Sequence, residues 1–169
     1  AKPKIKIFMK NLLLSVQTWL YVVCFTVIGG FTAHAQTLLL DNGPGCNVTS
    51  PTQLSILQTN LGLDTYGFGA AQSGGFTVAD DFVLTSAENI GHFEFYTYQT
   101  GASSASITGA YVKIWSGDPS AGGTVVWGDL TTNVLTSVSL TGGYRVLDTD
   151  QGGTTRQLQL VKVNTPGLS

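Results

Sequence analysis

The stretch ITGAYVKIW, residues 107–115, alternates its side chains with the period of two that is typical of a β-strand. The expected core face carries three apolar side chains: Ala110, Val112 and Ile114. The opposite face, which we expect to be half-solvated, carries Tyr111, Lys113 and Trp115. From residue 36 onward no segment of ten or more residues keeps a helical period. The sequence therefore predicts an all-β fold.

Seven further stretches lie between turn-forming Gly, Asn and Asp residues and are also predicted strands. They are residues 36–40, 76–84, 90–98, 124–127, 134–140, 144–147 and 156–163. Their spacing predicts an antiparallel β-sandwich that is jelly-roll-like. No repeat or linker divides residues 36–169, so we expect one domain there, truncated at its C-terminus because the last strand runs into a turn and stops.

Residues 41–75 form a long expected loop with one apolar patch, LSILQTNLGL, and a loop of this length is usually functional or packs a short element of its own. The stretch TVADDFVLT, residues 77–85, then places two adjacent carboxylates inside an expected strand. Three apolar side chains share the face of Asp80: Val78, Phe82 and Leu84. We therefore expect Asp80 to be buried. Its predicted role, or that of Asp81, is to tether a neighbouring loop by accepting backbone N–H bonds.

Residues 1–35 differ from the rest, because they carry four lysines, no acid and an apolar run over residues 12–31. The tripeptide Ala-His-Ala that follows has small residues where a signal peptidase reads them, which predicts a signal peptide cleaved between Ala35 and Gln36. Translation is expected to begin at Met9, which gives a leader of normal length. The alternative is an uncleaved membrane anchor, because the apolar run is long enough to span a bilayer if its polar residues are tolerated.

Without this leader the chain keeps four cations against ten acids, a formal charge of −6 (4 minus 10). So few cations cannot neutralise a run of phosphates, which excludes nucleic acid as the expected partner. Contact with a membrane is expected only through the signal peptide during export. Cys46 is the only thiol after residue 35 and cannot form an internal disulfide. These features predict a secreted or cell-surface bacterial protein.

Few residues suit a catalytic site. A glycosidase needs two carboxylates about 5 to 10 Å apart, and the only glutamates after residue 35 are Glu88 and Glu94. Folding could bring Glu94 close to Asp80 or Asp81, which keeps a secreted carbohydrate-active hydrolase as the alternative function. His92 is the sole histidine in this part of the chain, and no Gly-x-Ser-x-Gly motif accompanies it. We therefore expect a half-buried, hydrogen-bonded strand histidine rather than a catalytic one.

Calcium is the metal favoured by the composition, since hard oxygen ligands suit an acidic exported domain. Residues 148–153, DTDQGG, begin like a calcium loop, with Asp at the first and third positions and Gly at the sixth. The pattern then fails at Gly152 and Gln159, the fifth and twelfth positions. The candidate ligands of a structural calcium are Asp41, Asp80, Asp81, Asp148 and Asp150. The other expected partner for a buried Asp is Arg145 or a set of turn amides.

Aromatic side chains indicate a second kind of site. Rings on the face of a sandwich can bind the apolar C–H faces of sugars. The candidate platform consists of Tyr98, Tyr111, Trp115 and Trp127. The alternative is that these rings fill the core, because aromatic residues are favoured in strands.

Five stretches, VADDF, FYTYQTG, VKIWSGDPSAGGTVVWGD, TTN and YRV, together resemble a family of exported bacterial β-sandwich modules. The similarity covers nearly all of residues 38–163 and is most specific in the turn WSGDPSAGG and the WGD that follows it. The resemblance implies an N-terminal signal and often a surface-sorting segment. It also implies further strands and a Tyr-Trp-rich segment that this chain lacks, and it brings no catalytic residues.

The WSGDPSAGG turn is also explained by its residue types. Asp118 before Pro119 favours a turn, and Gly122 and Gly123 can adopt the positive φ that reverses the chain. Taken together, the sequence predicts a noncatalytic secreted or cell-surface module that serves adhesion, glycan contact or structural display.

Overall fold

The computed structural model describes residues 37–49 and 51–169, so the predicted signal peptide and its cleavage site at Ala35 and Gln36 lie outside the described residues. Residues Leu39–Ser169 form one compact unit. Its strands are β1 (Leu54–Leu57), β2 (Ile90–Thr97), β3 (Lys113–Ser116), β4 (Thr124–Gly128), β5 (Leu135–Leu147) and β6 (Gln157–Leu168). Three single-turn 3₁₀ helices complete the regular structure of this unit: η1 (Thr59–Leu61), η2 (Gln72–Gly74) and η3 (Pro119–Ala121). The all-β prediction is confirmed.

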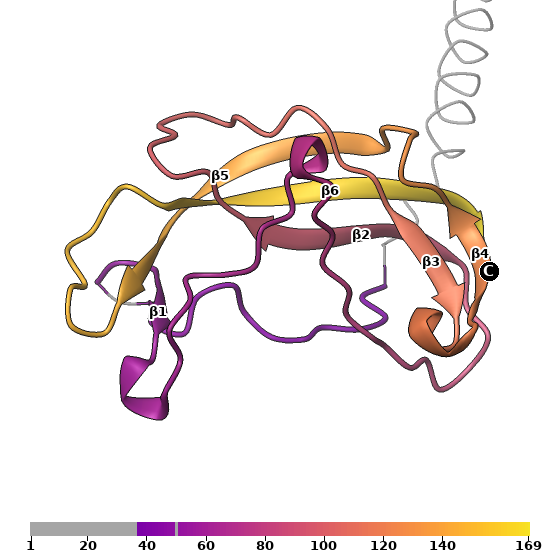
Figure 1. Ribbon diagram of the computed structural model, residues 1–169, viewed down its shortest axis with the longest axis horizontal. Coiled ribbons are helices and arrows are strands. Elements are labelled where there is room, and N and C mark those ends of the chain that lie inside the picture. Colours follow the sequence, from indigo (N-terminus) through magenta and orange to yellow (C-terminus); the bar gives the residue numbers. More distant parts are fainter. Residues whose placement is uncertain (1–36, 50) are drawn as a thin grey trace, which may run out of the picture. The chain divides into compact units, whose positions relative to one another are not determined.

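Four strands form one twisted sheet in the order β1-β5-β6-β2, and β3 and β4 form a separate two-stranded hairpin (Figure 1). The pairs β5–β6, β2–β6 and β3–β4 are antiparallel, as expected, whereas β1 runs parallel to β5. In the described residues no helix has the length and apolar character needed to cross a bilayer.

One buried cluster lies against a single face of β6. The side chains at its alternate positions are all 0 % exposed: Gln159, Val161, Val163 and Thr165. Ala110 joins the two valines in the buried cluster, and partly buried apolar side chains surround it, namely Phe93, Ile107, Val112, Val134, Leu135 and Val138. The predicted core face of residues 107–115 is therefore confirmed at Ala110 and Val112.

The backbone of residues 107–112 forms no strand, because side-chain amides replace a ladder of backbone bonds. Asn133 Oδ1 accepts hydrogen bonds from the N–H of Ala110 (3.0 Å) and of Leu135 (3.1 Å), and Asn133 Nδ2 donates to the Thr108 carbonyl (3.1 Å). The N–H of Val134 donates to the Ala110 carbonyl at 2.8 Å. One asparagine thus holds this segment over the sheet.

Several predicted strands change their bounds. Residues 107–115 are strand only from Lys113, and residues 134–140 and 144–147 merge into β5 through an irregularity between Leu140 and Tyr144. Residues 37–40 and 76–84 form no strand, so both predictions were wrong there. The long loop over residues 41–75 contains short elements of its own, β1, η1 and η2, as the sequence allowed.

The burial predicted for Asp80 is also wrong. Because residues 76–84 pair with no neighbouring strand, their alternation does not create a core face: Val78 is 55 % exposed and Val83 80 % exposed. Asp80 and Asp81 are both exposed. The ring of Phe82 meets that of Phe93 on β2 with centroids 5.6 Å apart, and Leu84 is partly buried.

Replacing Asn133 tests how residues 107–112 are held. Asn133→Ala leaves the part-buried N–H of Ala110 without its acceptor. It should therefore lower the free energy of unfolding by about 1 to 3 kcal/mol, measured by urea denaturation. Asn60→Ala, at an exposed position, is the matched control and should change stability by less than about 0.5 kcal/mol. Equal stability of the two variants would contradict the assigned role of Asn133.

Candidate functional site

The acid of the WSGDPSAGG turn is used to shape the chain. Asp118 Oδ1 accepts hydrogen bonds from both the N–H and the hydroxyl of Ser120, each at 2.7 Å, at the start of η3. These bonds, the hydroxyl first, lower the pKa of Asp118. Gly122 ends the turn at φ 88°, and a Cβ on Gly123 would lie 2.6 Å from the Gly117 carbonyl oxygen. The motif is therefore a closely packed turn that leads from β3 into β4.

Asp129 organises the loop that follows β4. Its carboxylate accepts four hydrogen bonds, from the N–H and hydroxyl groups of Thr131 and Thr132, at 2.6 to 2.8 Å. These bonds, led by the Thr131 hydroxyl, hold the pKa of Asp129 far below its usual range. The residues of the TTN stretch thus have two roles. Thr131 and Thr132 donate hydrogen bonds to Asp129, and Asn133 holds residues 108–110.

Acid should loosen this loop. Because the pKa of Asp129 is lower in the folded chain than in the unfolded one, its stabilisation is complete above the unfolded pKa of about 4 and is lost as the pH falls toward the folded value. In melting-temperature scans from pH 5 to pH 2, Asp129→Asn should therefore lose less stability on acidification than the parent chain. Asp64→Asn, at an exposed loop acid, is the charge control. If Asp129→Asn keeps the parent's full acid sensitivity, this role for the carboxylate is wrong.

The five candidate calcium ligands are not brought together. Asp41 Oδ1 accepts from the Gly43 N–H at 2.8 Å, and Asp80 accepts from Asn42 Nδ2 at 3.3 Å and from the Asp81 N–H at 3.0 Å. Asp80 thus tethers the loop of residues 41–43, although through a side-chain amide rather than its backbone. Among residues 37–49 and 51–169, no three His, Cys, Asp or Glu side chains are placed to share a metal ion.

The DTDQGG stretch braces a different loop. Asp148 accepts from the Thr59 hydroxyl at 2.7 Å and from the Asn60 N–H at 3.3 Å, and these bonds, the hydroxyl first, lower its pKa. Gln151 Nε2 donates back to the Asp148 carbonyl at 3.3 Å, while Asp150 is exposed. The Asp148 carboxylate therefore fixes η1 to the end of β5.

Two of the candidate catalytic residues, His92 and Glu94, lie close to Lys162 on β2 and β6. Glu94 Oε1 is 3.6 Å from His92 Nε2 and 3.4 Å from Lys162 Nζ. His92 is half-buried on a strand, as predicted, with Glu94 as its charged neighbour. Glu88 accepts a hydrogen bond from the Ser86 hydroxyl at 2.8 Å. Both glutamates thus have polar partners nearby in the chain.

The four predicted platform rings have different neighbours in the structure. Ile114 pairs with Trp127 and Trp115 pairs with Val125, and the register between β3 and β4 shifts between these two pairs. Trp127 Nε1 donates to the Pro166 carbonyl at 3.1 Å, which ties it to β6. Trp115 is half-buried, with Lys113 Nζ 5.7 Å from its ring centroid. In the described chain the indole N–H of Trp127 is therefore hydrogen-bonded to β6, whereas that of Trp115 has no hydrogen-bond partner.

The two tyrosines of the predicted platform pack on glycines. A Cβ on Gly109 would lie 3.1 Å from the ring of Tyr111, and a Cβ on Gly67 would lie 3.9 Å from Cε1 of Tyr98. Both rings are half-buried. Tyr98 therefore lies beside the loop that carries Tyr66, whereas Tyr111 lies over its own segment.

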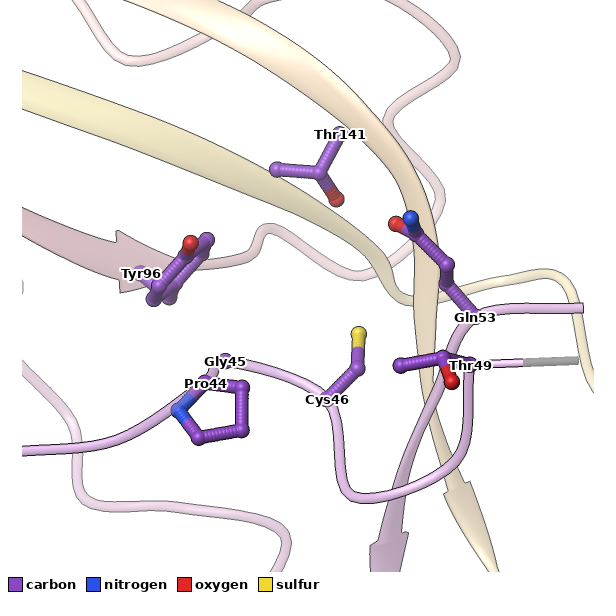
Figure 2. Close-up of a pocket in the computed structure, with 7 residues that line it drawn as sticks. All are labelled: Pro44, Gly45, Cys46, Thr49, Gln53, Tyr96 and Thr141. Atoms are coloured by element: carbon purple, nitrogen blue, oxygen red, sulfur yellow. The ribbon is translucent and has the colours of Figure 1, made fainter.

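A cavity of about 140 Å³ lies between β2, β5 and the loop before β1 (Figure 2). Its lining residues are Pro44, Gly45, Cys46, Thr49, Gln53, Tyr96 and Thr141. The Tyr96 ring packs directly on Gly45, where a Cβ would lie only 2.6 Å from the ring. Cys46 is 8 % exposed, and burial raises the pKa of its thiol. The thiol is therefore mostly protonated at neutral pH and is a poor nucleophile.

Alkylation measures this burial. In native buffer near pH 8, iodoacetamide should modify Cys46 much more slowly than in denaturant, because both burial and the raised pKa reduce the reactive thiolate. Mass spectrometry of the peptide that contains Cys46 reads the rate, with free glutathione as the reagent control. Equal rates for the native and denatured chains would show that the thiol is open to solvent.

A polar group that the sequence did not predict lies where β1, β5 and β6 meet. Arg145 Nε donates to the Tyr66 carbonyl at 2.9 Å and Arg145 Nη1 to the Ser55 hydroxyl at 3.1 Å. The sequence had suggested Arg145 as the partner of a buried Asp, and these acceptors show that it is not. The guanidinium carbon of Arg156 lies 3.7 Å from the centroid of the Tyr66 ring. The sequence hints at this group only by placing two of the four cations after residue 35, Arg145 and Arg156, in predicted strands.

Comparison with protein-family models, with curated proteins and with solved structures gives no match. The resemblance to exported bacterial modules therefore stays a prediction.

Proposed function

We propose that this chain is a noncatalytic module of a secreted or cell-surface protein and that it contacts glycans. The observation that carries the proposal is that three aspartates accept hydrogen bonds within the loops and turns of the chain. Asp118, Asp129 and Asp148 each accept N–H and hydroxyl bonds from a turn, so they stabilise loops. A carboxylate held ionised in this way is poorly suited to proton transfer near neutral pH.

The β3–β4 hairpin supports the contact with sugars. The Asp118 turn fixes one of its ends and the Asp129 loop follows the other, while the indole of Trp127 is bonded to β6. Trp115 on β3 has a half-buried ring, and Lys113 Nζ lies 5.7 Å from its centroid. An aromatic ring held in this way can stack on a sugar at a low cost in side-chain entropy.

A glycan array with the purified chain tests the proposal. We expect binding to at least one glycan class, with Trp115→Ala losing most of that binding while lowering the melting temperature less than Trp127→Ala does. Trp127→Ala is the comparison and should mainly lower the melting temperature, because it removes the hydrogen bond to Pro166. Binding to no glycan, or full binding by Trp115→Ala, would contradict the proposed contact.

Polysaccharide turnover is the second readout, because a secreted carbohydrate-active hydrolase is the alternative function. We expect no turnover by the parent chain. Turnover that disappears in Glu94→Gln would overturn the noncatalytic proposal.

A further inference from the structure

Arg145 on β5 lies directly opposite Arg156, the residue before the start of β6. The pairing of Tyr144 with Gln157 sets Arg145 against Arg156, and the N–H of Arg145 donates to the Arg156 carbonyl at 2.9 Å. Residues opposite each other in an antiparallel pair project from the same face, so both guanidinium groups leave the sheet on one side. Like charges in this position repel each other and destabilise a sheet.

No carboxylate of the described chain forms an ion pair with either arginine. The ion pairs found there involve His92, Lys162 and Glu94, and neither arginine has an acid within 4.0 Å. This is unexpected in a chain that has ten acids and only four cations after residue 35. Two of those four cations are therefore gathered at one place without a counter-ion from the chain.

The surrounding residues orient both guanidinium groups. Arg145 uses two of its N–H groups on the Tyr66 carbonyl and the Ser55 hydroxyl. Arg156 stacks on the Tyr66 ring at 3.7 Å, a contact that uses the flat face of the guanidinium and leaves its edge free. Within the described residues the side-chain N–H groups of Arg156 have no protein acceptor, and both arginines are half-buried.

We propose that Arg145 and Arg156 form a binding site for the carboxylate or sulfate group of an acidic glycan. The free guanidinium edge of Arg156 can bind such an oxyanion with two parallel hydrogen bonds, and the remaining N–H groups of Arg145 can add to them. Partial burial strengthens both the hydrogen bonds and the charge attraction. The proposal rests on the proposed glycan contact and names the chemical class of its ligand.

Calorimetry with three probes tests the site: a uronic-acid oligosaccharide, its neutral methyl ester and sodium sulfate. We expect the purified chain to bind the free acid at least about tenfold more tightly than the ester, which corresponds to about 1.4 kcal/mol. Equal affinity for acid and ester would overturn the anion site, even if binding of neutral glycans still supports the proposed function. If sulfate binds and neither oligosaccharide binds, the assignment of the ligand to a glycan would be overturned.

Variants locate the binding. Arg156→Gln should abolish the preference for the acid, and Arg156→Lys should restore it only in part, because lysine keeps the charge but loses the planar pair of donors. Lys162→Gln removes the same unit of charge six residues along β6, about 20 Å away, and should keep the preference. Equal loss in Lys162→Gln and Arg156→Gln would show a general charge effect and overturn the site.

Discussion

Strand β6 is hydrogen-bonded along both edges, to β5 and to β2, and buries every side chain of one face from Gln159 to Thr165. Two of those side chains are polar and need partners, because a buried group without one costs about 1 to 3 kcal/mol. Gln159 finds its partner in the N–H and hydroxyl of Ser106, and Thr165 donates to the Ile90 carbonyl at 2.6 Å. The central strand thereby fixes the segment that covers the core and the start of β2.

The same constraint explains how the charged residues are distributed. The core offers no place for a carboxylate, and the aspartates lie in the loops, where they accept bonds from nearby N–H and hydroxyl groups. Asp129 and Asp148 show the pattern, the first within one loop and the second between two parts of the chain far apart in sequence. The sheet itself carries Glu94 beside Lys162, and the register of β5 on β6 brings Arg145 and Arg156 together. The acids therefore shape the fold, and the proposed contacts with a ligand fall to aromatic and basic side chains.

Periodicity in the sequence was enough to locate β2, β4, β5 and β6 and the core face of residues 107–115. It reports which side chains share a face, but not which neighbour a strand has. Residues 76–84 alternate as well as a true strand does, yet no strand pairs with them, so Asp80 stays exposed. Residues 107–112 have the predicted face, but a single asparagine distant in sequence replaces their ladder.

The candidate sites show the same limit. The turn role of Asp118 could be predicted, because its partners lie within a few residues. The surroundings of the aromatic platform could not be judged from sequence, since the acceptor of the Trp127 indole N–H is the Pro166 carbonyl, 39 residues away. The arginine pair depends on the register between two strands, which no local pattern encodes.

Amide hydrogen exchange, followed residue by residue by NMR, is the most direct test of β6 as the central strand. We predict that the amides from Gln159 to Thr165 exchange among the slowest in the chain, through global unfolding, and that residues 76–84 exchange quickly. Fast exchange along β6, or protection of residues 76–84 equal to that of β6, would contradict the structure on which every proposal here depends.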